Sequence, residues 1–200
     1  LPKHVFIGGD LLPHRMKTVE KFDDFVIDFL FPMFRNLKKT LGKDYPGIFI
    51  ILGNDDPRIE ETKFLQGNQE GLFFYLNNQK QIWGDITVYG YPYIPPTPFQ
   101  LKDWEKYDVS RYVDPGCIHP TEGFRSVQPG EDIEYATISA DLRLLAGEDD
   151  MERAVFLFHT PPYNCHLDRA ALDGIKVEHV PLDVHVGSIA VQRFIRNKQP

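Results

Sequence analysis

Three apolar runs in this chain each end on a residue that can bind a metal ion. The end residues are Asp10, Asn54 and His159, and the runs before them are residues 5–9, 48–53 and 154–158. In an open α/β sheet, ligands gather beyond the carboxyl ends of the strands, so these three side chains can meet despite their separation in sequence. A carboxylate, an amide oxygen and an imidazole suit Mn, Fe or Zn rather than a thiolate-bound metal. The pattern predicts a metal-dependent hydrolase.

The elements that must position these residues follow from hydrophobic periodicity. Residues 17–37 carry apolar side chains at helical spacing and predict an amphipathic helix that covers a sheet, and Pro32 is expected to kink or divide it. The acidic, proline-containing segment 56–61 has the composition of a helix N-terminus, which places Asn54 and Asp55 in the turn before it. Short strands are expected around residues 72–76 and 86–91.

The second half of the chain adds two helices and an insertion. One helix is predicted over residues 134–146 with Gly147 as its stop, and another begins near Ser188. The segment from about residue 91 to 130 is rich in Pro, Gly and aromatic residues and is interpreted as an ordered insertion. The alternation of strands and helices predicts a layered α/β domain.

Composition limits the classes of protein to consider. At 200 residues and 42% hydrophobic content, residues 1–200 are expected to form a single domain. The net charge of −7 argues against an extended nucleic-acid interface. The two cysteines, Cys117 and Cys165, predict neither a disulfide framework nor a thiolate zinc site, which favours a cytoplasmic location. No apolar stretch approaches the ~20 residues of a membrane span, so no membrane contact is expected.

The strand ends also resemble motifs of a known family, the calcineurin-like metallophosphoesterases. The matching residues, in the order of three central family motifs, are Gly9-Asp10, Gly53-Asn54-Asp55-Asp56 and the lone His159. Residues 185–195 resemble the helix that precedes the last motif in one branch of the family. The resemblance implies an α-β-β-α sandwich of the metallophosphoesterase type, with mixed sheets flanked by helices. It also implies two divalent metal ions, Mn, Fe or Zn, as cofactors.

The resemblance further implies a role for each residue. Asp10 would bridge the two metals, with Asn54 and His159 on the second one, and a metal-bridging hydroxide would attack a phosphate mono- or diester. Asp55 stands where many relatives carry a histidine that protonates the leaving group, and a carboxylate can do this only if its pKa is raised. The expected substrate is a small phosphorylated or nucleotide-like molecule.

Two family motifs have no counterpart in the chain. The opening Asp-x-His and the closing Gly-His-x-His are absent, so the domain is expected to be incomplete at both ends. The alternative function is a non-catalytic scaffold or ligand-binding module that keeps the fold. In that case Asp10, Asn54 and His159 serve as turn, cap and core-edge residues.

Other residues remain open to two interpretations. His14 lies four residues after Asp10 and either contacts substrate or belongs to a solvated turn. Four aromatic residues of the insertion either wall a cleft that stacks on a nucleoside or pack locally: Tyr91, Tyr93, Phe99 and Trp104. Four arginines are candidates for contact with phosphate: Arg15, Arg58, Arg125 and Arg169.

Overall fold

Two three-stranded sheets form the centre of the molecule. The computed structural model describes residues 1–13, 23–170, 176–177, 180–181 and 185–200. The first sheet is parallel, in the order β1 (His4–Gly8), β2 (Gly47–Ile51) and β3 (Phe74–Tyr75). The second pairs β4 (Gln79–Trp83) antiparallel with β5 (Ile86–Tyr91), and β5 parallel with β6 (Ala154–Phe158). A separate antiparallel pair is β7 (Lys176–Val177) and β8 (Val180–Pro181).

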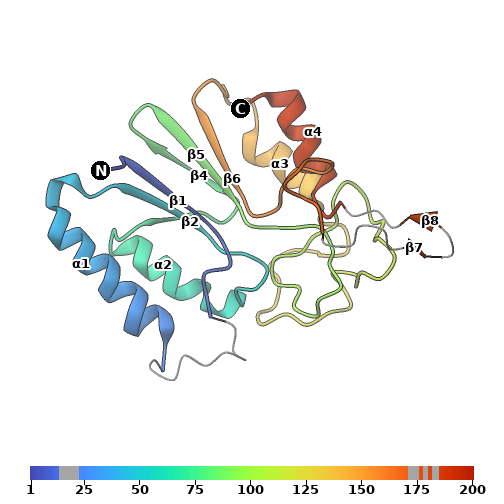
Figure 1. Ribbon diagram of the computed structural model, residues 1–200, viewed down its shortest axis with the longest axis horizontal. Coiled ribbons are helices and arrows are strands. Elements are labelled where there is room, and N and C mark those ends of the chain that lie inside the picture. Colours follow the sequence, from blue (N-terminus) through green and yellow to red (C-terminus); the bar gives the residue numbers. More distant parts are fainter. Residues whose placement is uncertain (14–22, 171–175, 178–179, 182–184) are drawn as a thin grey trace.

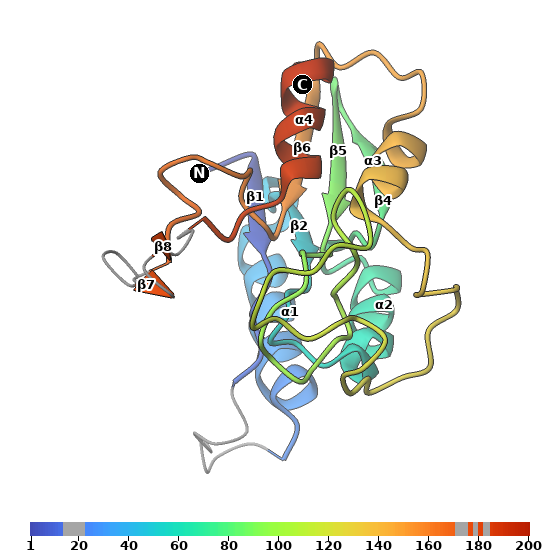
Figure 2. The ribbon, with the colours of Figure 1, turned by 90° about the vertical axis from the view of Figure 1, so that its right-hand side faces the viewer.

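The two sheets pack face to face between helices. β1 contacts β6 and β2 contacts β5. Apolar side chains fill the space between the sheets: Phe49, Ile51, Leu76, Val88, Val155 and Leu157. Helices α1 (Phe31–Leu41) and α2 (Glu61–Gln69) lie beside the first sheet, and α3 (Ile138–Ala146) and α4 (Ile189–Lys198) lie beside the second (Figures 1 and 2). The fold is therefore mixed α/β, with two small sheets flanked by helices.

The three strands predicted to carry the site residues are all present. β2 lies between two parallel neighbours and is buried along its whole length, which explains its continuous apolar run. β1 and β6 are edge strands of their sheets and are only partly covered. The contact between β1 and β6 places their carboxyl ends together although they belong to different sheets.

The first helix differs from its prediction. Part of the expected range, residues 14–22, lies outside the described residues. Over the rest, a π-helical turn at Val26–Leu30 precedes α1, and the Phe31 N–H donates to the Val26 carbonyl. Pro32 lies at the start of α1, and Leu30 and Phe31 before it keep helical backbone angles, so the π-helical turn runs directly into α1. The change from π to α geometry lies next to the proline, where a kink or division was expected, and α1 continues to Leu41, beyond the predicted end.

The bounds of other helices and strands also differ from their predictions. α3 begins at Ile138, because the Thr137 hydroxyl accepts the Ala140 N–H and caps the helix there. The short 3₁₀ turn η3 (Arg58–Glu60) precedes α2, and a similar turn, η2 (Gly42–Asp44), follows α1. β3 is shorter than predicted. β4 was not predicted, because its sequence is mostly polar and the strand is largely exposed.

The insertion packs against the carboxyl ends of the strands. Residues 92–137 contain isolated bridges but none of the named helices or strands. Their segment 101–108 buries several charged side chains, with Lys102 Nζ 2.6 Å from Glu105 and Lys106 Nζ 2.6 Å from Asp141. Trp104 in the same segment is fully buried. These contacts hold a long segment without regular secondary structure in a defined arrangement.

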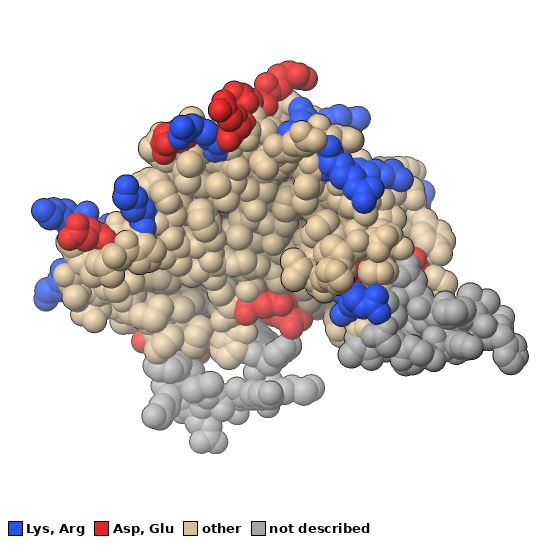
Figure 3. Space-filling model, turned by 45° about the horizontal axis from the view of Figure 1, so that its top comes forward, with Lys and Arg blue, Asp and Glu red and all other residues tan. Residues whose placement is uncertain are grey.

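On the face shown in Figure 3, Lys and Arg lie beside Asp and Glu at the upper left, Lys and Arg predominate at the upper right, and a group of acidic side chains lies toward the lower middle. Most of the remaining middle of this face carries no charge. Across the described residues, no helix combines the length and apolar character needed to cross a membrane.

Candidate metal centre

The three strand-end residues meet at one point. His159 Nε2 lies 3.0 Å from Asn54 Oδ1 and 3.3 Å from Asp10 Oδ1. Asp10 and Asn54 follow neighbouring parallel strands, β1 and β2, whereas His159 follows β6 of the other sheet. The packing of β1 on β6 therefore brings together residues that are 149 positions apart in the sequence (159 − 10).

Hydrogen bonds fix the orientation of both the imidazole and the amide. His159 Nδ1 lies 2.7 Å from the Gly8 carbonyl oxygen, which can only accept, so Nδ1 carries the proton. Asn54 Nδ2 donates to Asp55 Oδ1 at 3.1 Å, which turns Asn54 Oδ1 toward His159. Nε2 of His159 faces two oxygen acceptors. It either donates a proton to them, with the ring as an imidazolium, or binds a cation together with them.

The electrostatics of His159 agree with this geometry. Burial disfavours the charged imidazolium, but the hydrogen bonds to Asp10 and to the Gly8 carbonyl and the charge of Asp10 outweigh it. The pKa of His159 is consequently raised above its ordinary value. The site therefore stabilises positive charge at this position.

Close backbone packing explains the glycine before Asn54. A Cβ atom on Gly53 would lie 2.3 Å from Asp10 Oδ1 and 2.5 Å from His159 Cε1. Asp10 itself adopts a left-handed backbone conformation with φ of 54°, which is uncommon for a residue other than glycine. Backbone strain of this kind persists where the surrounding structure imposes it, often at functional sites.

The donor spacing fits a single metal ion. Two ligand atoms that each lie ~2.0–2.2 Å from one ion are roughly 2.8–3.6 Å apart in octahedral or tetrahedral geometry. The separations of 3.0 Å and 3.3 Å fall within this range, which they share with direct hydrogen bonds and ion pairs. Asp10, Asn54 and His159 can therefore bind one divalent ion as a set of two oxygens and one nitrogen. Among the described residues, no group of three or more His, Cys, Asp or Glu side chains could hold a metal ion, so the candidate set depends on the Asn54 amide oxygen as its third donor.

The remaining predicted site residues differ in position. The carboxylate of exposed Asp55 faces the Asn54 amide, and its backbone N–H donates to Asp10 Oδ1 at 3.0 Å. Asp55 thus borders the centre. His14 lies outside the described residues, so its predicted contact with substrate stays a prediction.

The aromatic and basic candidates mostly have structural partners. Tyr91, Tyr93 and Trp104 are buried, which supports local packing rather than a stacking surface, whereas Phe99 is exposed. Arg58 pairs with Glu61 and stacks on Trp104, and Arg125 donates to the carbonyls of Glu105 and Pro120. Arg15 lies outside the described residues, and Arg169 forms an isolated β-bridge with His185, so a contact of either arginine with phosphate stays a prediction.

Sequence reasoning missed two contributors. The Gly8 carbonyl that orients His159 is a backbone group, so no residue type marks it. Asp56 was placed in the Gly53-Asn54-Asp55-Asp56 motif and at the start of a helix, with no role of its own, but its carboxylate accepts N–H groups from the loops that carry Asp10 and Asn54. Its position directly after Asn54 and Asp55 was the available signal.

Comparisons of the chain with protein-family models, with curated proteins and with solved structures found no match.

Proposed function

We propose that this protein is a metal-dependent phosphoesterase whose residues Asp10, Asn54 and His159 bind a divalent metal ion. The observation that carries the proposal is the convergence of these three donors at metal-ligand spacing. The arrangement of two sheets between helices is compatible with the sandwich of the calcineurin-like metallophosphoesterases. Mn, Fe or Zn suits the mixed donor set.

The residues of the chain prepare the centre in three ways. The Gly8 carbonyl holds the His159 ring so that Nε2 faces the ligand position. The Asp55 backbone N–H holds Asp10 Oδ1, and the Asp55 carboxylate holds the Asn54 amide. A bound divalent metal would supply Lewis acidity and a more acidic water, so hydrolysis of a phosphate mono- or diester needs no nucleophilic side chain.

The role of Asp55 is narrower in this proposal. Its exposed carboxylate borders the centre and accepts the Asn54 amide N–H, so its part in this proposal is to orient Asn54. Two metals, as in the complete family site, would need ligands beyond the three residues described above. The proposal for this chain therefore specifies the ligands of one ion.

Metal content and phosphoesterase activity together test the proposal. We expect purified protein to bind Mn²⁺ by calorimetry and to hydrolyse bis-p-nitrophenyl phosphate or p-nitrophenyl phosphate only with added metal. His159→Ala should lower kcat/KM by roughly 100-fold or more, since even residues that only support a metal ligand contribute about 10–100-fold. His119→Ala is the matched control, because that histidine contacts Tyr107 of the insertion.

One observation favours the alternative of a non-catalytic binding module. Asp10 Oδ1 already accepts a hydrogen bond from the Asp55 N–H, so one lone pair of that oxygen is occupied within the protein instead of facing a metal ion. Stoichiometric Mn²⁺ binding without turnover of either ester would support the binding module. Absence of both binding and turnover would refute a metal centre.

A further inference from the structure

A buried carboxylate joins the two loops that carry the metal-ligand candidates. Asp56 is fully buried. Its Oδ1 accepts the Leu12 N–H at 2.8 Å, and its Oδ2 accepts the Gly53 N–H, also at 2.8 Å. Leu12 lies two residues after Asp10, and Gly53 directly precedes Asn54. One side chain therefore connects the ends of β1 and β2 beyond their last strand residues.

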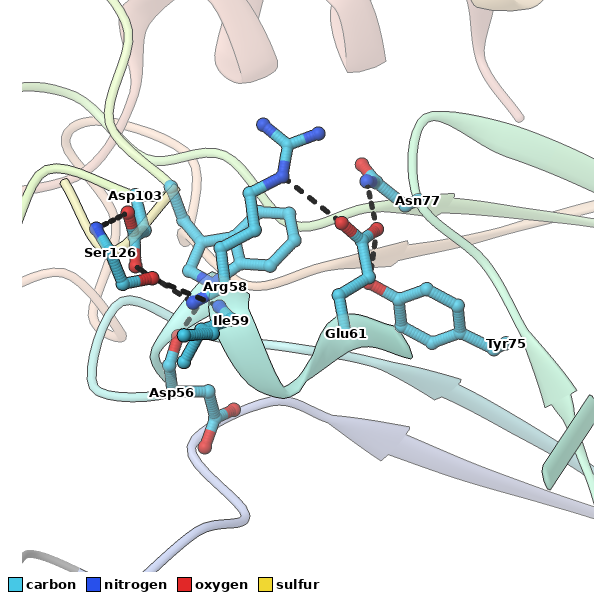
Figure 4. A network of polar contacts seen from close by, with 9 residues as sticks. Asp56, Arg58, Ile59, Glu61, Tyr75, Asn77, Asp103 and Ser126 are labelled. Atoms are coloured by element: carbon cyan, nitrogen blue, oxygen red, sulfur yellow. Dashed lines mark hydrogen bonds and ion pairs between the residues drawn. The ribbon is translucent and has the colours of Figure 1, made fainter. Parts of the chain in front are cut away.

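The insertion holds Asp56 from the other side. Trp104 Nε1 donates to the Asp56 carbonyl at 2.7 Å, and the Asp56 N–H donates to the Gly53 carbonyl at 3.1 Å. Figure 4 shows the Asp56 carboxylate directed toward the chain that follows β1, away from Arg58 and Glu61. Both the backbone and the side chain of Asp56 are thus fixed.

A helix-capping role does not explain this arrangement. The turn η3 begins at Arg58, its N-cap residue is Pro57, and no side chain caps it. The Asp56 carboxylate instead accepts from residues that lie outside the helix it precedes. Its partners belong to the loops that carry Asp10 and Asn54.

We propose that Asp56 is a positioning residue that sets the separation of Asp10 and Asn54, and through it the metal affinity of the centre. This inference rests on the proposed function. Groups that orient metal ligands typically change metal affinity by about 10–100-fold when they are removed. The insertion contributes to this positioning through Trp104, because the indole N–H of Trp104 donates to the Asp56 carbonyl and holds the Asp56 backbone in place.

The chain provides a matched control in Asp103. This residue is also almost fully buried, and it accepts the N–H groups of Arg58 at 2.7 Å and Ser126 at 2.8 Å. It joins the insertion to the segment after Asn54, as Figure 4 shows, and among the described residues its hydrogen bonds come from Arg58 and Ser126 rather than from residues 9–13. Asp103→Asn therefore removes a comparable buried charge without separating Asp10 from Asn54.

The experiment compares Asp56→Asn, Asp103→Asn and the unmodified chain at a temperature where all are folded. Titration calorimetry with Mn²⁺ should show affinity about 10–100-fold weaker for Asp56→Asn and within about threefold of the unmodified chain for Asp103→Asn. Amide hydrogen exchange should accelerate at Leu12 and Gly53 in Asp56→Asn, and at Ser126 in Asp103→Asn. If Asp56→Asn does not fold, Trp104→Phe, which removes the indole donor to Asp56 together with part of a buried ring, should weaken Mn²⁺ binding several-fold.

The outcomes separate this inference from the proposed function. Equal Mn²⁺ affinity in Asp56→Asn and the unmodified chain, or equal weakening in Asp103→Asn, would overturn the positioning role. If the unmodified chain binds no Mn²⁺, the proposed function fails. In that case the amide exchange rates of Leu12 and Gly53 in Asp56→Asn still test whether Asp56 joins the two loops. Rates equal to those of the unmodified chain would refute that structural role as well.

Discussion

His159 Nδ1 and the Gly8 carbonyl oxygen are 2.7 Å apart, so an imidazole at the end of β6 is hydrogen-bonded to the backbone at the end of β1. This contact crosses from one sheet to the other. It fixes the imidazole ring and leaves Nε2 beside Asp10 and Asn54. The candidate centre is thus built at the junction of the two sheets, and its geometry depends on how they pack.

The first prediction concerns Gly53. Its substitution by alanine places a Cβ against Asp10 and His159, so either the backbone or these two side chains must move. We expect Gly53→Ala to lower the free energy of unfolding by about 1–3 kcal/mol, as overpacking does elsewhere. Mn²⁺ affinity should fall as well. Denaturant unfolding and calorimetry would measure the two effects.

Gly130→Ala is the control for this prediction, because a Cβ there meets no atom within 4 Å. It should leave both the unfolding free energy and Mn²⁺ binding nearly unchanged. Normal Mn²⁺ affinity in Gly53→Ala would mean that the close packing around Gly53 does not define the site.

A second prediction concerns Lys106, whose side chain is 2% exposed. Its ammonium lies 2.6 Å from Asp141 and 2.7 Å from Glu131, and 4.2 Å from the centre of the Tyr93 ring. Lys106→Ala leaves buried Asp141 without its cation, so we expect a loss of about 3–5 kcal/mol in the free energy of unfolding. Urea denaturation would measure it.

The comparison is Arg153→Ala, which removes an exposed ion pair with Asp85. Such pairs contribute only about 0–1 kcal/mol. Equal effects of the two substitutions would show that the insertion does not depend on its buried ion pairs.

The third prediction is a dependence of stability on pH through Asp168. Burial opposes the charged form of this carboxylate, but hydrogen bonds from His185, Cys165 and Asn164 outweigh it and hold the pKa of Asp168 below its ordinary value. A lowered folded-state pKa adds stability above the unfolded-state pKa of about 3.9, and that stability is lost as pH falls through the folded-state pKa.

Asp168→Asn should therefore be less stable than the unmodified chain near pH 5, with the difference shrinking as pH falls below about 4. Unfolding curves at a series of pH values would measure it. A constant difference across that series would contradict the linkage.

A fourth prediction concerns the start of α4. Asp108 accepts the backbone N–H groups of Ile189 at 2.7 Å and Ala190 at 3.1 Å, and the hydroxyl of Ser188 at 2.5 Å. Asp108→Ala leaves these donors without an acceptor, so we expect a loss of about 1–3 kcal/mol in unfolding free energy. Thermal unfolding would test this. Thr137→Ala, which removes a simple cap from α3, should cost only about 1 kcal/mol.

Sequence patterns predicted the local elements where burial is strong. The continuous apolar run of β2 marks a strand that is buried along its whole length. The equally apolar run of β6 was recognised although that strand is only partly buried. Sequence patterns were less accurate for an exposed strand and for a helix whose first residue is set by a hydrogen bond. β4 is largely exposed and carries little apolar pattern, and the Thr137 cap, rather than periodicity, sets the start of α3.

The sequence by itself determined which residues end the strands and that their donor atoms suit a metal. The tertiary structure decided that they meet. Asp10 and His159 belong to different sheets, and only the packing of β1 on β6 brings His159 Nε2 to 3.3 Å from Asp10. The bonds of Asp56 to Leu12 and Gly53 were likewise beyond sequence reasoning. The physical reason is that such contacts depend on the relative placement of elements distant in the chain, which local periodicity does not encode.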